Sequence, residues 1–141
     1  MNSGSFFKVI GNTTDIKPEE VTRILLCTGK IYYDLNEHRK QAERDDIAIV
    51  RMEQLYPVPH EELEKALAPY PEGTPVYWVQ EEPENMGAWR FIYCRFKGNL
   101  FGRHPLKGVY RPASASPATG SGRSHQFEQE MLISESFREE R

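Results

Sequence analysis

An amide and two carboxylates stand in a row at the end of an apolar run, and they are the residues best suited to chemistry: Gln80, Glu81 and Glu82. The run before them, Val76–Val79, has no polar break, as in a strand buried on both faces of a parallel sheet. Pro83 cannot donate to a sheet ladder, so we expect the strand to end there. Because α/β folds place binding groups at such strand ends, this edge is a candidate binding site. The alternative is a solvated loop with charges that favour a nearby helix start.

Two site motifs begin in this sequence but are not completed. Gly29-Lys30 suggests a phosphate-binding loop, but that motif requires Gly at position 24 and Ser or Thr at position 31, and both positions hold Ile. His60-Glu61-Glu62-Leu63-Glu64 begins like a zinc-protease helix, but Glu64 stands where the second His is required. The four histidines have no ligand spacing, so we expect surface or capping roles for them: His38, His60, His104 and His125.

The two cysteines do not form a disulfide framework. Cys27 ends an apolar strand just before a helix start, where a thiolate would be stabilised. A nucleophile also needs a base, and no nearby residue supplies one, so we expect Cys27 to be a buried structural thiol. We also expect Cys94 to be reduced and buried. A reducing compartment follows, either the bacterial cytoplasm or an organelle matrix.

The elements that position these residues alternate between strand and helix. Strands are expected at Arg23–Cys27, Ile47–Val50 and Val76–Val79, and helices over about 31–44, from Pro59 onward and from Asn85 onward. This alternation predicts an α/β fold, with a mostly parallel sheet in the middle of three layers and helices on both faces.

Apolar spacing predicts which helix residues point inward. In the first helix these are Ile31, Tyr32, Leu35 and Ala42, in the second Leu63, Ala66, Leu67 and Tyr70, and in the third Trp89, Ile92, Tyr93 and Phe96.

The C-terminal third predicts one more strand and one more helix. Val109-Tyr110 is a short strand, and the small, Pro-rich stretch 111–120 resembles a linker. Ser124 is expected to cap a final helix. On that helix the inward positions are expected to be Phe127, Met131 and Phe137.

The composition is that of an ordinary globular domain, with 141 residues, 28% charged, 38% hydrophobic and a formal net charge of −3. We expect residues 1–20 to be an incoming extended segment and residues 21–141 a single α/β domain. No basic cluster is interleaved with aromatics, so nucleic acid is not an expected partner. No apolar run approaches the roughly 20 residues that span a bilayer, and the N-terminus does not resemble a signal peptide.

Four blocks of sequence resemble one enzyme family. They are L-L-C-T-G-K-I-Y-Y-D-L (25–35), A-I-V-R-M-E-Q-L-Y-P-V-P (48–59), Q-E-E-P-E-N-M-G-A-W (80–89) and R-P-A-S-A-S-P-A-T-G (111–120). Together they resemble the C-terminal domain of the first component of 2-oxoglutarate dehydrogenase, from about Arg23 to Phe137. The resemblance implies a fold like that of the transketolase C-terminal domain.

The resemblance also implies a function that lies mostly outside these 141 residues. The full enzyme binds thiamine diphosphate and magnesium between two other domains, across a dimer interface. It decarboxylates 2-oxoglutarate in the tricarboxylic acid cycle and passes the succinyl group to the succinyltransferase component. The motifs for this chemistry lie upstream. We therefore expect this chain to contain no catalytic, cofactor-binding or metal-binding residues and to be inactive alone.

For this chain the resemblance implies a role in assembly, as a domain that helps to form the dimer and braces the catalytic domains. Polar residues that follow the strands are expected to pack against the missing domains or a second subunit: Arg51, Glu53, Gln54, Gln80, Glu81, Glu82, Asn85, Trp89 and Arg111.

Two other functions remain as alternatives. One is a free-standing α/β module that binds a nucleotide or small acid at the Thr28-Gly29 and Gln80–Glu82 edge. The other is a small enzyme that uses Cys27. The related 2-oxoadipate enzyme shares parts of the four blocks, so the substrate also stays open.

Overall fold

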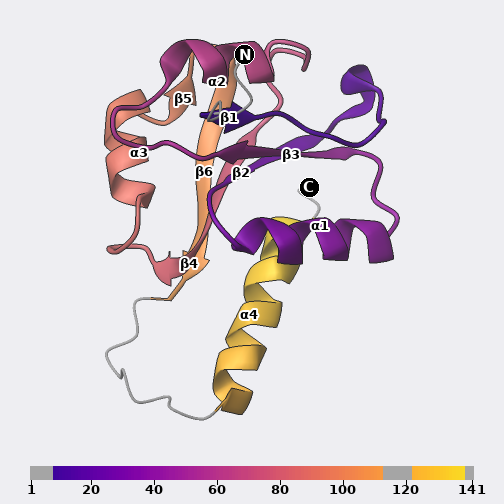
Figure 1. Ribbon diagram of the computed structural model, residues 1–141, viewed down its shortest axis with the longest axis vertical. Coiled ribbons are helices and arrows are strands. Elements are labelled where there is room, and N and C mark those ends of the chain that lie inside the picture. The colour runs from indigo at the N-terminus through magenta and orange to yellow at the C-terminus, as the bar shows by residue number, and fades with distance from the viewer. Residues whose placement is uncertain (1–7, 113–121, 139–141) are drawn as a thin grey trace, which may run out of the picture.

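Four parallel strands form the centre of a six-stranded sheet (Figure 1). The computed structural model describes residues 8–112 and 122–138. The central strands are β2 (Arg23–Cys27), β3 (Ile47–Met52), β4 (Val76–Pro83) and β6 (His104–Arg111). Two short antiparallel strands, β1 (Val9–Ile10) and β5 (Asn99–Leu100), complete the order β1-β3-β2-β4-β6-β5. The expectation of a mostly parallel sheet is confirmed.

Helices cover both faces of this sheet (Figure 1). One face is covered by α1 (Ile31–Gln41) and α4 (Gly122–Ser136), and the other by α2 (His60–Leu67) and α3 (Trp89–Phe96). A short 3-10 helix, η1, lies at Pro18–Glu20. The three-layer α/β arrangement predicted from the sequence is confirmed. Within the described residues, no helix has the length and apolarity needed to cross a membrane.

The alternation of side chains along β2 explains its unbroken apolar sequence. Ile24 and Leu26 lie in the core beneath α2 and α3, whereas Leu25 and Cys27 lie in the core beneath α1 and α4. Successive strand residues point to opposite faces, and both faces of this strand are covered by helices. Every residue of β2 is buried.

The direction of the chain places four strand ends together. Because β2, β3, β4 and β6 are parallel, their carboxyl ends meet at one edge of the sheet, which we call the carboxyl edge. From β2 the chain passes to β3 on one side and then returns to β4 on the other. Ligands of open α/β sheets bind at such a reversal of strand order, so this edge is where a site is expected.

The C-terminal helix is tied to the first central strand. The Arg23 guanidinium donates to the carbonyl oxygens of Ser136 at 2.7 Å and Glu135 at 3.3 Å, and it lies 4.1 Å from the centre of the Tyr77 ring. Phe137 is buried at the end of α4, as the sequence predicted. The two hydrogen bonds join residues more than 100 positions apart.

The N-terminal segment is held by a buried arginine that the sequence gave no reason to expect. Arg39 is 4% exposed and donates to Asn12 Oδ1 at 2.7 Å, the Ile47 carbonyl at 3.0 Å and Asn36 Oδ1 at 2.9 Å. Asn12 Oδ1 also accepts from the Ile49 amide at 3.1 Å. Because β1 pairs with β3, part of the expected incoming segment belongs to the sheet. A domain boundary near residue 20 stays a prediction.

Several inward-facing predictions are wrong. Phe127 and Met131 are 62% and 57% exposed, because α4 turns Leu132, Ile133 and Phe137 toward the sheet instead. On α3 only Trp89 and Ile92 are buried, since a helix of eight residues presents a narrow face to the core. Contrary to prediction, Ala42, just after α1, is exposed, and so are Tyr93 and Cys94 of α3.

The sequence-based prediction underestimated the strands at the C-terminal end of the sheet. The strand expected at Val109-Tyr110 extends over all of β6, and β5 was not predicted. Positive φ angles at Lys97 and Gly98 turn the chain sharply out of α3, which lets β5 pair back on β6. Residues 113–120 of the expected linker and the capping side chain of Ser124 lie outside the described residues.

An ion pair between Arg44 and Asp46, in the turn before β3, makes a pH-dependent contribution to stability. The Arg44 guanidinium donates to both carboxylate oxygens of Asp46 at 2.9 and 3.1 Å, and the Thr22 hydroxyl donates at 2.6 Å. These hydrogen bonds, that from Arg44 foremost, lower the pKa of Asp46 to about 2. A carboxyl group with a lowered pKa stabilises the fold above its unfolded pKa, and that contribution is lost as the pH falls through the folded value.

We therefore expect Asp46→Asn to lower the free energy of unfolding at neutral pH by about 1 kcal/mol, after allowance for the partial exposure of the pair. The difference from the parent protein should shrink as the pH falls from about 4 to about 2. Urea denaturation across this range measures it. An Asp46→Asn effect that is independent of pH would contradict the assignment.

Candidate functional site

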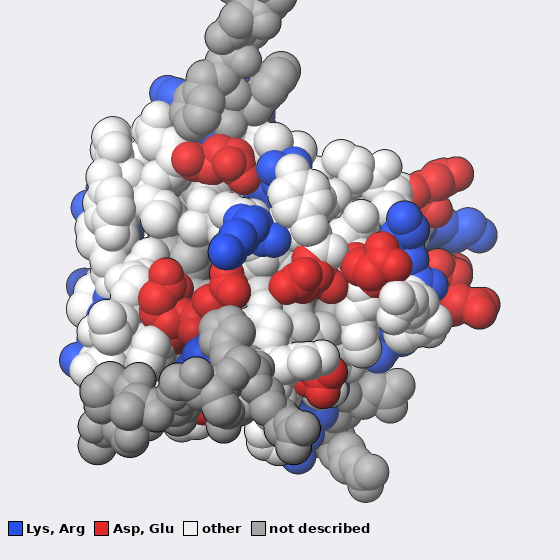
Figure 2. Space-filling model, turned by 60° about the horizontal axis from the view of Figure 1, so that its bottom comes forward, with Lys and Arg blue, Asp and Glu red and all other residues white. Residues whose placement is uncertain are grey.

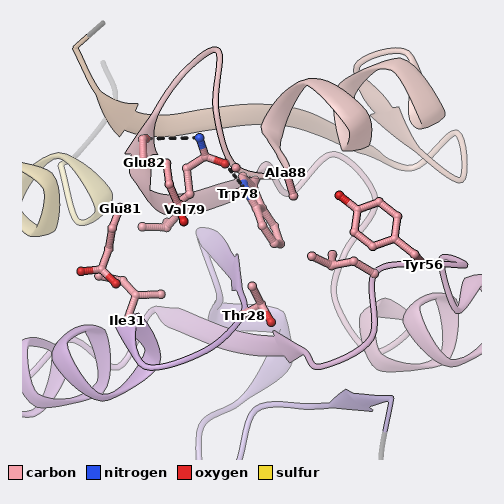
Figure 3. Close-up of a pocket in the computed structure, with 11 residues that line it drawn as sticks. Thr28, Ile31, Tyr56, Trp78, Val79, Glu81, Glu82 and Ala88 are labelled. Carbon is pink, nitrogen blue, oxygen red and sulfur yellow. Dashed lines mark hydrogen bonds between the residues drawn. The ribbon is translucent and has the colours of Figure 1, made fainter. Parts of the chain in front are cut away.

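A pocket of about 320 Å³ opens at the carboxyl edge, between the ends of β2 and β4 (Figure 3). Apolar and aromatic side chains line it together with two carboxylates, those of Glu81 and Glu82. Tyr56 lies on one side, and Glu81 lies on the other, beside Ile31 (Figure 3). The lining residues are Thr28, Ile31, Leu55, Tyr56, Trp78, Val79, Gln80, Glu81, Glu82, Gly87 and Ala88.

Each wall follows directly from the fold. Thr28 comes immediately after β2, and Ile31 begins α1, so one wall is the turn between them. Leu55 and Tyr56 follow β3 and form a second wall. The end of β4 and the residues just before α3 form the rest. The pocket therefore lies at the reversal of strand order between β2 and β4, where α/β proteins bind ligands.

The buried amide of Gln80 organises the end of β4. Its Oε1 accepts from Trp78 Nε1 at 2.9 Å and from the Trp89 amide at 2.9 Å. Its Nε2 donates to three carbonyl oxygens, those of Glu82 at 3.2 Å, Pro83 at 2.7 Å and Met86 at 2.8 Å. Gln80 is 4% exposed, so these bonds replace water for a fully buried polar group. Gln80 thus holds the turn from β4 to α3 in one shape.

Gly87 is required for the same turn. Its φ angle is +69°, a conformation that L side chains rarely adopt. A Cβ atom at this position would lie 2.9 Å from Gln80 Oε1 and 3.0 Å from Glu82 Oε1. The close packing of Gly87 against these side chains forms the wall of the pocket next to α3.

Glu81 and Glu82 are the polar groups that the pocket presents to a ligand. Glu81 is half-buried and Glu82 is exposed. Within residues 8–112 and 122–138, neither carboxylate has a hydrogen bond or an ion pair. Both residues belong to β4 by their backbone, rather than to the loop that the sequence suggested.

A second polar group lies at the end of β3. The Arg51 guanidinium stacks 4.4 Å from the centre of the Tyr32 ring, and its Nε lies 3.4 Å from Glu53 Oε2. Both of these atoms are buried, and neither has a well-aligned hydrogen bond in the described part of the chain. Arg51 and Glu53 therefore neutralise one another beside the start of α1.

Cys27 is buried beneath this pair and is not a nucleophile in the folded chain. Burial is the main cause that raises the pKa of the Cys27 thiol to about 12, and the nearby Arg51 opposes the shift only in part. A thiolate is the reactive form, so almost none is present at neutral pH. The sequence-based expectation of a structural thiol agrees with this environment. Cys94 is a free, exposed thiol.

We expect a thiol reagent such as dithionitrobenzoate to modify Cys94 in the native protein and to leave Cys27 unmodified at about pH 8. Denaturation should release the second thiol. Cys94→Ser supplies the matched control, because the native variant should then contain no reactive thiol. Rapid modification of native Cys94→Ser would show that Cys27 is accessible and activated, which this structure contradicts.

Arg111 lies at the end of β6 and binds the middle of α4. It donates to Glu128 Oε1 at 2.9 Å and also to Gln129 Oε1. Gln129 in turn donates to Asp34 Oδ2 of α1 at 2.9 Å. Arg111 had been assigned to a loop, and the structure places it in the strand.

The structure thus gathers most of the predicted site residues along one edge but gives them different roles. Gln80 and Trp89 are buried and fix the turn, and Arg51, Glu53 and Arg111 have partners within the chain. Gln54 donates to the Pro57 carbonyl at 2.9 Å, and Asn85 is exposed. Among the described residues, Glu81 and Glu82 are the charged members of this set that line the pocket, and neither has an ion pair there.

Sequence reasoning missed the exposed apolar residues around the pocket. Tyr56 and Met86 are 64% and 57% exposed, and Phe91 packs against Tyr56 with ring centres 4.6 Å apart and ring planes inclined by 49°. Nothing in the local pattern distinguishes an exposed Tyr or Met from a buried one. The sequence Tyr56-Pro57 could have indicated an outward turn.

The prediction of surface or capping roles for the histidines is wrong for His104. His104 was expected at the surface, but it is fully buried, with Nδ1 2.8 Å from the Thr74 carbonyl oxygen. Burial lowers its pKa. Across the described ranges, no group of three or more His, Cys, Asp or Glu side chains could hold a metal ion.

Comparison with solved structures identifies the class of fold. The chain is similar to the split-gene transketolase described as an inactive β4 tetramer, with a TM-score of 0.53 and 14% sequence identity. The match covers 85% of this chain and 39% of that protein. At this identity the likeness concerns the fold, which is of the transketolase type.

The chain belongs to the 2-oxoglutarate dehydrogenase C-terminal family, whose pattern matches residues 1–137. It is 44% identical over 135 residues to the 2-oxoglutarate dehydrogenase E1 component of Haemophilus influenzae and 40% identical over 134 residues to that of Cupriavidus necator. It is also 40% identical over 140 residues to the 2-oxoadipate dehydrogenase complex component E1 of Danio rerio. The sequence-based resemblance is confirmed.

These relatives are much longer than this chain. The matches cover 96%, 95% and 97% of the chain but only 14%, 14% and 15% of the respective relatives. The relatives come from bacteria and from an animal.

Proposed function

We propose that this chain acts as the C-terminal domain of a thiamine-diphosphate-dependent 2-oxoglutarate dehydrogenase and contributes to its dimer assembly, bracing the catalytic domains. The main support is the family match over nearly the whole chain, together with its small share of each relative. The domain would comprise residues 21–141, and the complete enzyme would act with a succinyltransferase component. By analogy with the relatives, the expected location is the bacterial cytoplasm or the mitochondrial matrix.

The carboxyl edge supports an assembly role. It combines a pocket with exposed aromatic residues and charged groups, which is the composition of a surface that a protein covers. The interface candidates that remain exposed or half-exposed there are Arg51, Glu53, Gln54, Glu81, Glu82, Asn85 and Arg111. Gln80 and Trp89 would contribute by holding the edge in shape.

The described residues at the carboxyl edge do not fit thiamine diphosphate or its metal ion. Glu81 and Glu82 at the mouth of the pocket would repel a diphosphate, and no basic residue lines the pocket to compensate. The part of the chain that the structure describes supplies no cluster of metal ligands. Cofactor chemistry is therefore assigned to the remainder of the longer polypeptide, and this chain alone is expected to be inactive.

The same charges weigh against the alternative of a free-standing module for nucleotides or small acids. Such ligands are anions, and the pocket presents carboxylates to them. A thermal-shift series with nucleotides, acyl-CoA and thiamine diphosphate distinguishes the two functions, because a ligand that binds only the folded state raises its melting temperature. The assembly function predicts no shift.

The direct test of the assembly role is made in the longer polypeptide. Deletion of residues 21–141 should abolish dimerisation, followed by light scattering, and release of carbon dioxide from 2-oxoglutarate. The milder change Glu81→Ala with Glu82→Ala should weaken the dimer or its thermal stability. Normal dimerisation and turnover after the deletion would refute the proposed function.

A further inference from the structure

The pocket at the carboxyl edge combines two features that a small anionic ligand does not need. One is the pair of carboxylates, Glu81 and Glu82, without partners in the described chain. The other is exposed apolar surface beside the pocket: Tyr56, which lines it, packs at a tilt against Phe91, and Met86, next to the lining residue Gly87, is 57% exposed. Tyr, Phe and Met are enriched at the centres of protein interfaces.

The charge around the pocket favours a cation. Several acidic side chains, with Lys and Arg side chains among them, lie across the face shown in Figure 2. None of the residues that line the pocket is Lys or Arg. A carboxylate that is covered by protein without an opposite charge is strongly unfavourable, so a partner that covers this edge must bring positive charge to it.

The walls select the kind of cation. Tyr56 and Trp78 present aromatic rings to the cavity, and aromatic faces attract guanidinium groups. Ile31, Leu55 and Val79 give an apolar surface that suits the methylene stem of a long basic side chain. A planar guanidinium also forms paired hydrogen bonds with carboxylates, which an ammonium does not.

We propose that this pocket receives an arginine side chain from the part of the longer polypeptide that lies outside this chain. The proposal rests on the proposed function, since only a longer polypeptide supplies that arginine. The guanidinium pairs with Glu81 and Glu82, and residues beside the arginine cover Tyr56, Met86 and Phe91. The order that Gln80 imposes on the end of β4 keeps both carboxylates in place before docking.

The test is site-specific photo-crosslinking in the longer polypeptide. Benzoylphenylalanine replaces Tyr56, and mass spectrometry identifies the peptide that it captures. We expect one segment from outside this chain, with an arginine within a few residues of the crosslink. Benzoylphenylalanine at Tyr93, an exposed aromatic position on α3 that does not line the pocket, should not capture that segment.

Charge variants complete the test. Glu81→Gln with Glu82→Gln should reduce the Tyr56 crosslink about tenfold, equivalent to about 1.4 kcal/mol. Glu130→Gln, at an exposed carboxylate on α4, should leave it unchanged. Replacement of the captured arginine by Lys should weaken the crosslink, and replacement by Ala should remove it.

Three results would overturn the proposal: no crosslink, capture of a segment without arginine, or capture of a second copy of these 141 residues. A crosslink unaffected by the Glu81→Gln and Glu82→Gln changes would overturn it as well. Turnover of 2-oxoglutarate in the same preparation reports separately on the proposed function. An active enzyme without the crosslink refutes only the arginine docking, whereas a crosslinked protein without turnover refutes the function.

Discussion

Gln80→Ala is expected to lower the free energy of unfolding of the chain by about 3 kcal/mol. The substitution removes five hydrogen bonds made by one buried amide. The indole N–H of Trp78 and the amide N–H of Trp89 would lose their acceptor within the core, and an unsatisfied buried donor costs about 1–3 kcal/mol. Urea denaturation followed by tryptophan fluorescence measures the change.

Gln54→Ala is the matched control for Gln80→Ala. Gln54 is also a glutamine beyond a central strand, but in the described part of the chain its side chain makes a single hydrogen bond, to the Pro57 carbonyl. Its loss is expected to change stability by no more than about 0.5 kcal/mol. Equal effects from the two substitutions would show that Gln80 does not organise the end of β4 and that the pocket is not preformed.

Arg39→Ala should also lower the free energy of unfolding by about 3 kcal/mol, because it removes three hydrogen bonds from a buried charged donor and such bonds are strong. Asn12 Oδ1 and the Ile47 carbonyl are the acceptors that join the N-terminal segment to β3 and α1. We expect faster proteolysis before residue 20 in the variant, since this tie is lost. Urea denaturation and limited proteolysis measure the two effects.

Arg90→Ala serves as the control for the Arg39 substitution. Arg90 is also a helical arginine, but its side chain is 63% exposed in its ion pair with Glu84. Exposed pairs contribute about 0–1 kcal/mol, so a small change is expected. If Arg39→Ala proved as mild as Arg90→Ala, the buried arginine would not anchor the N-terminal segment.

The central layers could be predicted from the sequence because their signals are local. Apolar runs such as Arg23–Cys27 and Val76–Val79, separated by helical spacing, determine a parallel sheet with covered faces. The switch to polar residues at Gln80 falls in the last part of β4, beside the pocket, and the role of this edge stays a prediction. The family could be predicted because four long blocks occur in the same order as in its members.

The predictions that proved wrong concern residues whose burial depends on contacts between distant segments of the chain. Whether Phe127 or Leu132 faces the sheet depends on how α4 crosses β6, and its own sequence contains apolar residues on more than one side. Arg39 is buried only because Asn12 supplies an acceptor from another part of the chain. The roles of Gln80 and Trp89 were also missed, since residue type alone does not distinguish a buried amide from one at an interface.

Release of carbon dioxide from 2-oxoglutarate tests the central claim most directly. Labelled 2-oxoglutarate, thiamine diphosphate and Mg²⁺ are supplied to the purified 141-residue chain and, separately, to the longer polypeptide that contains it. The account predicts release by the longer polypeptide and none above background by the chain alone. Sustained release by the isolated chain would contradict the account, because its reacting groups would then lie within these residues.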